Sequence, residues 1–89
     1  MREFEIKPEL DKKIMKLAKR DKITYEAIMK KIGEITNSND IEHYKNLRYD
    51  MKDSKRVHIG SFVLVFSYDK AKDFVSFEEF DHHDKIYDT

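Results

Sequence analysis

The chain contains no cysteine and no tryptophan, and its 89 residues include one proline and two glycines. Without cysteine, the fold cannot be held by disulfides and cannot build a thiolate metal site, which agrees with a reducing cytoplasm. No apolar run approaches the length of a transmembrane helix, and the first residues do not resemble a secretory or transit segment. We therefore expect a soluble, cytoplasmic protein that acts without a membrane.

The chain also lacks a net charge, because 18 Lys and Arg residues balance 18 Asp and Glu residues. A protein that binds RNA by charge alone is normally basic throughout, and this one is not. The balance is uneven, however: residues 1–48 carry twelve basic and nine acidic residues, whereas residues 49–89 carry six and nine. This asymmetry is a weak indication that the first half faces a polyanion.

The chain does contain enough bulky apolar material for one small core. Eleven Phe and Tyr residues compensate for an apolar fraction of 39%, which is matched by a charged fraction of 40%. Two cores would each be too small for apolar burial to outweigh chain entropy. We therefore expect a single domain that spans residues 1–89.

The first half has the periodicity of one strand followed by two helices. Residues 2–6 alternate charged and apolar side chains, as in a half-buried strand. Residues 8–20 place apolar side chains on one stripe at helical spacing. A second helix is predicted to begin after Asp21 or Thr24, either of which can act as its N-cap, and to run to about Thr36.

The second half has the period of two that is typical of strands. We expect strands around residues 44–49, over residues 56–59 and 62–66, and from Phe74 onward. The predicted order is β-α-α-β-β-β-β. This is an α+β domain in which two N-terminal helices pack on an antiparallel sheet.

Arg56 and His58 form the first candidate site. Alternate residues of a strand share a face, so both side chains project from the same side. Cleavage of RNA without a metal needs a base for the 2′-hydroxyl, a cation for the phosphate and an acid for the departing oxygen, and histidine can supply either proton transfer. Two such residues can equally be ordinary solvent-facing side chains.

The C-terminal run from Asp81 to Tyr87 concentrates donors, acceptors, a cation and an aromatic ring. Tyr87 could stack on an unpaired base or hydrogen-bond to a phosphate. The alternative interpretation is a frayed polar terminus.

A metal site built from His58, His82, His83 and Asp84 must also be considered. Adjacent residues of a strand point to opposite faces, so His82 and His83 cannot both bind one ion unless the backbone turns there. The sequence also has no spaced ligand pair such as H-x-x-x-H. We therefore expect neither a metal nor a small-molecule cofactor.

Residues 54–66 and 80–87 resemble the YafQ-like branch of the RelE/ParE superfamily, which comprises toxins of type II toxin-antitoxin systems. The resemblance implies a RelE-like β-α-α-β-β-β domain that enters the ribosomal A site and cleaves mRNA without a metal. It also implies three partners, namely a cognate antitoxin protein that holds the toxin inactive, the ribosome, and mRNA.

The resemblance assigns roles to individual residues. It makes Arg56 a phosphate-binding cation, His58 an acid or base, His83 the C-terminal catalytic histidine, and Tyr87 the aromatic ring four residues beyond it. The residues expected to contact RNA are Lys45, Phe62, His82 and Lys85, of which Phe62 stands in the place of a tryptophan and Lys45 in that of a histidine.

The chain departs from the family pattern at two further positions. Many RelE proteins have an arginine where this chain has Val63, which favours the YafQ-like branch, and an aspartate of that branch is replaced by Ser61. Two rival functions remain: a ParE-like gyrase poison, which does not need the histidine set, and an inactive relative that only binds an antitoxin.

The first predicted helix offers a surface for the antitoxin. Antitoxins of this kind usually lay an amphipathic helix over apolar and basic surfaces of the toxin. Lys12, Lys16 and Lys19 form one such basic strip, although a simple solvated helix face would have the same residues.

Overall fold

The computed structural model describes residues 1–47 and 53–87 of the chain. Its helices and strands follow one another in the order β1 (Glu3–Ile6), α1 (Pro8–Arg20), α2 (Lys22–Thr36), a 3-10 helix (Ile41–His43), β2 (Ser54–Ile59), β3 (Phe62–Asp69), β4 (Phe74–His82) and α3 (His83–Tyr87). Within these described residues, no helix is long and apolar enough to cross a membrane.

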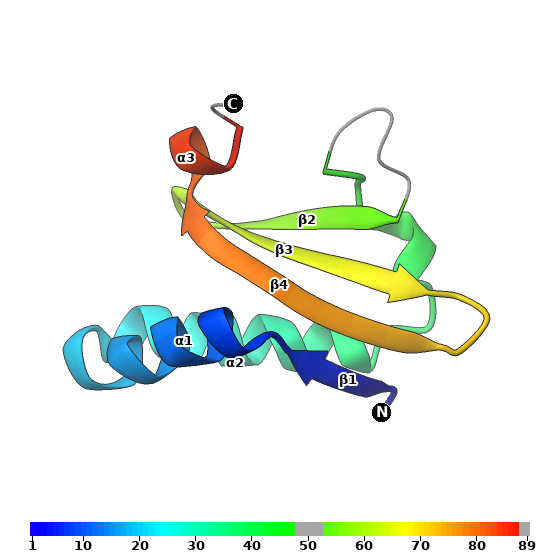
Figure 1. The fold of residues 1–89 in the computed structure, drawn as a ribbon, viewed down its shortest axis with the longest axis horizontal. Coiled ribbons are helices and arrows are strands. Elements are labelled where there is room, and N and C mark those ends of the chain that lie inside the picture. The colour runs from blue at the N-terminus through cyan, green and yellow to red at the C-terminus, as the bar shows by residue number, and fades with distance from the viewer. Residues whose placement is uncertain (48–52, 88–89) are drawn as a thin grey trace.

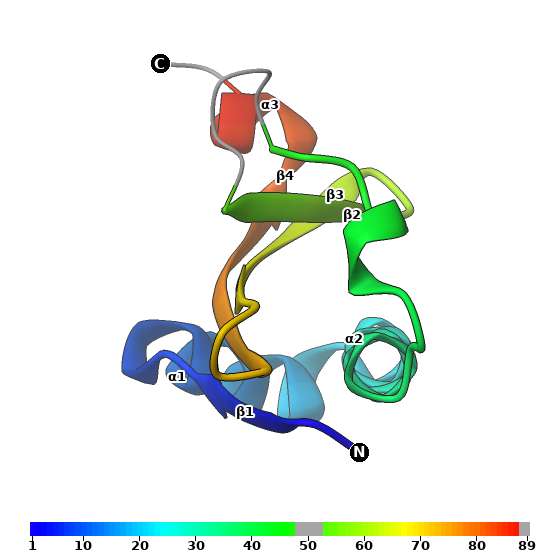
Figure 2. The same cartoon turned by 90° about the vertical axis from the view of Figure 1, so that its right-hand side faces the viewer.

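The four strands form one sheet in the order β1-β4-β3-β2. β2, β3 and β4 make an antiparallel meander, whereas β1 pairs in parallel with β4. The two long helices lie together on one side of the sheet, and α3 lies on the opposite side, above the ends of the meander strands (Figures 1 and 2). The α+β class and the predicted order of strand, two helices and sheet are therefore confirmed.

Local sequence explains where the two long helices begin. Pro8 occupies the start of α1, where its missing N–H is not needed, and Glu9 and Asp11 place negative charge in the first turn. Asp21, rather than Thr24, is the N-cap of α2: its side chain accepts hydrogen bonds from the Thr24 backbone N–H at 3.1 Å and from the Thr24 hydroxyl at 2.6 Å. These two hydrogen bonds lower the pKa of Asp21.

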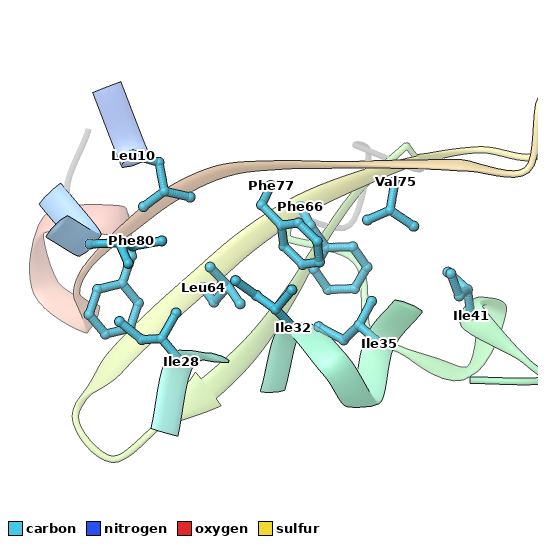
Figure 3. Close-up of a cluster of buried hydrophobic side chains, with 11 residues drawn as sticks. Leu10, Ile28, Ile32, Ile35, Ile41, Leu64, Phe66, Val75, Phe77 and Phe80 are labelled. Carbon is cyan, nitrogen blue, oxygen red and sulfur yellow. The ribbon is translucent and has the colours of Figure 1, made fainter. Parts of the chain in front are cut away.

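The main core lies between the sheet and the two long helices (Figure 3). Its buried members come from α1, α2, the 3-10 helix and the facing sides of β3 and β4: Leu10, Ile14, Ile28, Ile32, Ile35, Ile41, Leu64, Phe66, Val75, Phe77 and Phe80. Ile28, Ile32 and Ile35 are spaced by four and three residues, so one stripe of α2 covers the sheet.

The strand predicted around residues 44–49 does not form over the part of that segment that the structure describes. Residues 41–43 make the 3-10 helix, and Asn46 forms one isolated bridge with Lys55. Tyr44 packs against the main core, whereas Leu47 packs on the opposite face of the sheet. Residues three apart in a strand point to opposite faces, so these two side chains lie where strand alternation would place them. Pairing with β2 is limited to the one bridge, and no full strand develops. The last two residues of this prediction, Arg48 and Tyr49, lie outside the described residues.

Two other expectations need correction. The C-terminal run does not continue as a strand, because β4 ends at His82 and α3 begins at His83. The sheet is mixed rather than purely antiparallel, because Glu3–Ile6 runs parallel to β4. The helical crossover α1–α2 and the antiparallel meander that follows return the chain beside β1 in the same direction, which explains the parallel pairing.

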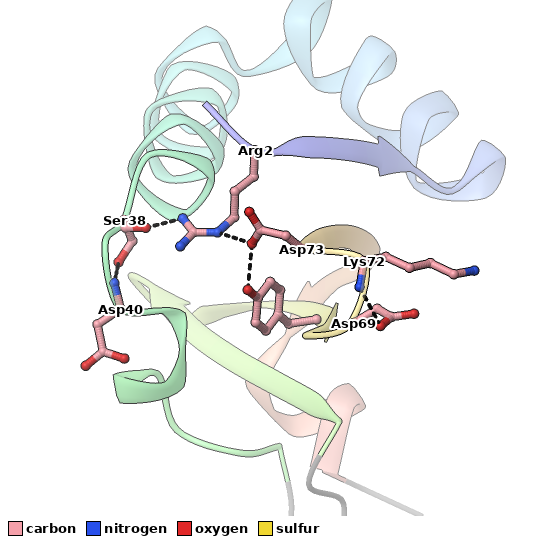
Figure 4. Close-up of polar contacts among 7 residues, drawn as sticks. Arg2, Ser38, Asp40, Asp69, Lys72 and Asp73 are labelled. Carbon is pink, nitrogen blue, oxygen red and sulfur yellow. Dashed lines mark hydrogen bonds and ion pairs between the residues drawn. The ribbon is translucent and has the colours of Figure 1, made fainter.

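A polar network ties the N-terminus to the end of the sheet (Figure 4). Arg2 donates from Nε to Asp73 Oδ1 at 2.7 Å, and its guanidinium also donates to the carbonyl of Ser38 after α2. The Tyr68 hydroxyl donates to the same Asp73 oxygen at 2.6 Å. Asp73 adopts a positive φ of 50° in the β3–β4 turn, and the hydrogen bonds from Tyr68 and Arg2 lower its pKa. The network therefore joins three segments that are distant in sequence.

Candidate active site beside α3

Alternation along β2 places two of the predicted residues on the side of the sheet away from the main core. Val57 and Ile59 pack against the main core. Arg56 and His58 therefore project to the other side, as the sequence predicted. His58 is exposed there, and Arg56 is half-buried.

The helix α3 is seated on this same side by a small second core. Ile86 is 8% exposed and packs with the fully buried Val63 and with Val65 of β3. The backbone N–H of His83 donates to the carbonyl of Ser61 at 2.9 Å, which anchors the first residue of the helix to the β2–β3 turn. Val63 thus forms part of the apolar surface on which α3 packs, and we call this surface the seat of α3.

The seating of α3 brings four side chains together, and we call them the histidine cluster: Arg56, His58, His83 and Tyr87. The His58 and His83 rings lie 5.6 Å apart between centroids with an interplanar angle of 30°. The Tyr87 ring lies 4.7 Å from that of His83. Arg56 Cζ lies 6.0 Å from the centroid of the Tyr87 ring. All four residues predicted to be catalytic therefore lie in one cluster.

The chemical capacity of the cluster follows from its members. It holds two imidazoles, a group that can serve as an acid or a base, beside one guanidinium that stays charged. Asp84 Oδ1 lies 3.6 Å from His83 Nδ1, so a carboxylate is close to one of the two rings. Such a set can serve general acid–base chemistry on an anionic substrate.

Lys45 is the predicted RNA-binding residue that lies near the histidine cluster. Its backbone carbonyl accepts a hydrogen bond from the Arg56 backbone N–H at 2.9 Å, which holds it against the edge of β2. Its side chain is exposed and borders a groove that Arg56 and His58 also line.

The other three predicted RNA-binding residues are separated from the cluster. Phe62 packs against the main core, stacks on Phe80 at 5.1 Å between centroids, and contacts the His82 ring at 5.7 Å. Lys85 borders a hollow between the α1–α2 turn and the end of β4, and Phe62 lines that hollow too. His82 and His83 therefore contact different neighbours, as strand alternation predicts for adjacent residues.

His43 is a potential functional residue that sequence reasoning set apart from the other histidines. Its Nδ1 is hydrogen-bonded to the carbonyl of Asp40, and its ring lies on that of Tyr44 at 4.1 Å between centroids. It lines the same groove as Lys45. A 3-10 helix of three residues has no periodic pattern to reveal it, so the sequence carried no signal for this position.

No three His, Cys, Asp or Glu side chains gather closely enough to hold a metal ion within residues 1–47 and 53–87. Asp84 Oδ2 also lies 3.8 Å from His82 Nδ1, so it is near both of the adjacent histidines. The ring of His58 is stacked on the ring of His83. The four ligands considered from the sequence thus do not converge on one point.

Comparison with known proteins gives two close relatives. The chain is 56% identical over 88 residues to a protein of Methanocaldococcus jannaschii named "Putative toxin RelE4", with 98% of this chain and 92% of that protein covered. It is 49% identical over 85 residues to an uncharacterized protein of Methanosarcina mazei, with 94% and 96% of the two chains covered. No family model matches the sequence.

Among solved structures, the crystal structure of the isolated E. coli RelE toxin has the same fold. The TM-score is 0.74 at 20% sequence identity, and the match covers 92% of this chain and 84% of that one. At this identity the likeness concerns the arrangement of the backbone. The two-helix layer, the sheet and their connections are therefore shared with that toxin.

Proposed function

The chain belongs to the family of RelE-type toxins, and we propose that it is a ribosome-dependent endonuclease that cleaves mRNA by metal-independent acid–base chemistry. The observation that carries this proposal is the histidine cluster, in which His58 and His83 lie side by side next to Arg56. A gyrase-directed toxin would not need two facing imidazoles on one exposed surface.

The proposed reaction uses one histidine as base and the other as acid. The base takes the proton of the ribose 2′-hydroxyl, and the 2′-oxygen then forms a bond to phosphorus. The bond from phosphorus to the 5′-oxygen breaks, and the acid protonates that oxygen. The products are a 2′,3′-cyclic phosphate and a free 5′-hydroxyl. Arg56 offsets the negative charge that gathers on the phosphate. Lys85 borders the hollow between the α1–α2 turn and the end of β4. Arg56 is therefore the cation of the histidine cluster.

Tyr87 is proposed to position the other members of the cluster. Its ring contacts His83 at 4.7 Å and lies under the Arg56 guanidinium at 6.0 Å, so one aromatic surface supports both. Tyr87 follows Ile86, whose burial fixes α3 on the sheet. A catalytic set needs such support because small displacements of reacting groups cost large factors in rate.

We infer that the chain lies in the YafQ-like branch of the family. Val63, which stands where many RelE proteins have an arginine, is fully buried beneath Ile86. A long cation could not occupy that apolar seat without losing its solvation. In place of that arginine, the histidines of the cluster are proposed to act as the catalytic groups on this side of the sheet.

A reconstituted translation reaction tests the proposal with a matched control. Purified wild-type protein is expected to cut mRNA in the A site of stalled ribosomes and to leave a cyclic phosphate. His83→Ala and Arg56→Ala are each expected to lose about 100-fold or more in rate. His82→Ala removes the same type of side chain from the adjacent position, outside the histidine cluster, and is expected to stay within a few-fold of wild type.

Two results would point to the rival functions. Growth arrest on induction, with DNA damage and intact mRNA, would indicate a gyrase poison. Soluble, folded protein that neither arrests growth nor cuts mRNA would indicate an inactive antitoxin-binding relative. Equal losses of cleavage rate in His82→Ala and His83→Ala would contradict the proposal that His83 belongs to the active site and His82 does not.

Membership of this toxin family implies a cognate antitoxin, and α1 is the proposed contact surface. Lys12, Lys16 and Lys19 are exposed, and Met15 beside them is 59% exposed, so a basic stripe carries an apolar anchor. This combination suits an acidic amphipathic helix. Replacing the three lysines by glutamine is expected to weaken co-purification with the product of a neighbouring small gene, whereas replacing Lys70 and Lys72 of the β3–β4 turn is not.

A further inference from the structure

A groove of about 430 Å³ lies between β2 and the residues that follow the 3-10 helix, next to the histidine cluster. Two of its lining residues, Arg56 and His58, belong to that cluster, so the groove and the candidate active site form one continuous surface. The groove is lined by His43, Tyr44, Lys45, Arg56, Val57 and His58.

The groove has an unusual charge for a neutral protein. Among the residues that the structure describes, its lining carries two cations, Lys45 and Arg56, and no carboxylate. Three other hollows among the described residues are each lined by two or three carboxylates. The charges of Lys45 and Arg56 are therefore not offset by a described carboxylate of the lining itself, although the net charge of the chain is zero. An anionic ligand is expected to favour this groove over the other hollows.

His43 has an exposed, flat ring at this groove, and a hydrogen bond and an aromatic contact fix the position of the ring. Its Nδ1 donates to the Asp40 carbonyl, which leaves Nε2 free of that bond. One face of the ring lies on Tyr44, and Tyr44 meets the buried Phe66 edge-on at 5.6 Å between centroids. The ring thus rests, through Tyr44, on the main core, and stacking on its open side would cost little conformational entropy.

We propose that this groove binds the mRNA nucleotide next to the scissile phosphate, with its base stacked on His43 and its phosphate held by Lys45 and Arg56. Aromatic rings beside cations are the usual means of holding single-stranded RNA. This subsite rests on the proposed nuclease function and adds to it a place for the flanking nucleotide. Arg56 would then lie between two consecutive phosphates.

The first test measures cleavage kinetics on programmed ribosomes. His43→Ala is expected to raise KM about tenfold with kcat within about twofold of wild type, because one base–aromatic stack is lost. His43→Phe keeps a flat ring and is expected to restore KM. A merely structural role for His43 would instead lower the thermal stability of both variants. Wild-type KM in His43→Ala would overturn the subsite while leaving the nuclease function standing.

The second test does not depend on cleavage and uses the absence of tryptophan in the chain. His43→Trp places a single indole at the groove, and a trinucleotide of RNA with 2′-O-methyl groups serves as a non-cleavable probe. Binding is expected to quench this indole by stacking. Ile23→Trp, at an 83% exposed position on α2, is the control and is expected to show no quenching.

Salt dependence then reports on the phosphate. Lys45→Gln in the His43→Trp background is expected to reduce the slope of log affinity against log salt by about 0.7, the value for one phosphate contact on a single strand. Quenching at position 43 without any mRNA cleavage would support the subsite and refute the nuclease. Absence of quenching up to millimolar trinucleotide, or equal quenching at position 23, would overturn the subsite.

Discussion

Replacing Ile86 by alanine is expected to release α3 from the sheet while the rest of the fold stays intact. Ile86 packs with Val63 and Val65 in a cluster that is separate from the main core. α3 has five residues, and a helix this short does not persist in water, because nucleation costs more than a single turn returns. Its presence therefore depends on docking, and Ile86 is its buried residue.

The magnitude follows from this separation. Burying a full isoleucine side chain contributes roughly 1.5–3 kcal/mol, and truncating one in a core that cannot relax costs about 2–5 kcal/mol. Here the loss of global stability is limited to the docking free energy of α3, because the helix detaches instead of leaving a cavity. We expect the free energy of unfolding to fall by less than about 2 kcal/mol. A loss of 2 kcal/mol in docking lowers the ratio of docked to undocked α3 by about thirtyfold.

Three measurements on the same variant check this expectation. Urea unfolding should show a small loss of stability, hydrogen exchange should show fast exchange of the α3 amides, and cleavage should fall at least about tenfold because His83 and Tyr87 leave with α3. Ile86→Val is the graded control. It removes one methylene, for about 0.5–1.5 kcal/mol, and should lower the docked ratio by no more than about tenfold.

Two outcomes would refute the reasoning. A loss of 4 kcal/mol or more in the free energy of unfolding would mean that α3 unfolds together with the main core. Wild-type cleavage with rapidly exchanging α3 amides would mean that docking does not assemble the active site.

Three further predictions concern the core, the polar network and the chemistry. Phe77→Ala removes a fully buried ring and should lower the free energy of unfolding by about 3–5 kcal/mol in urea; a loss below 1 kcal/mol would contradict its place in the core. The pKa of Asp73 is lowered by its hydrogen bonds from Tyr68 and the neighbouring guanidinium, so its stabilisation is present above the unfolded pKa and is lost as pH falls through the folded one. The Tm difference between wild type and Asp73→Asn should therefore shrink below about pH 4, and a constant difference from pH 7 to pH 3 would argue against the ion pair. His58→Gln and His83→Gln should each lower the rate of cleavage about 100-fold, and a rate within about threefold of wild type in either variant would rule out a division of the acid and base roles between the two histidines.

Local patterns determined most of the elements. The isoleucines of α2 repeat at helical spacing and its first turn carries a capping side chain, so both its extent and its buried stripe were readable from the sequence. β3 has a continuous apolar run, and it became a central strand buried on both faces. These features depend on residues within a few positions of one another, which is why the sequence alone specifies them.

Residues 41–47 and α3 were beyond such reasoning. Both are short, and each takes its conformation from a neighbour that is distant in sequence: residues 44–47 from the edge of β2, and α3 from the turn at Ser61 and the seat at Val63. Helical periodicity cannot be detected over five residues. Their shapes therefore depend on tertiary packing.

The candidate site divides in the same way. Alternation along β2 was enough to place Arg56 and His58 on one face, because side-chain direction in a strand is a local property. Strand register alone sets Phe62 opposite His82 and His58 opposite Val63, and it thereby decides which distant residues share a face. His83 follows His82 directly and lies on the other side of the sheet, beside His58. The sequence thus determined which side chains could perform the chemistry, whereas only the tertiary structure decided that His83 joins them and that Phe62 does not, because the distances between remote residues are set by register and by the seating of α3.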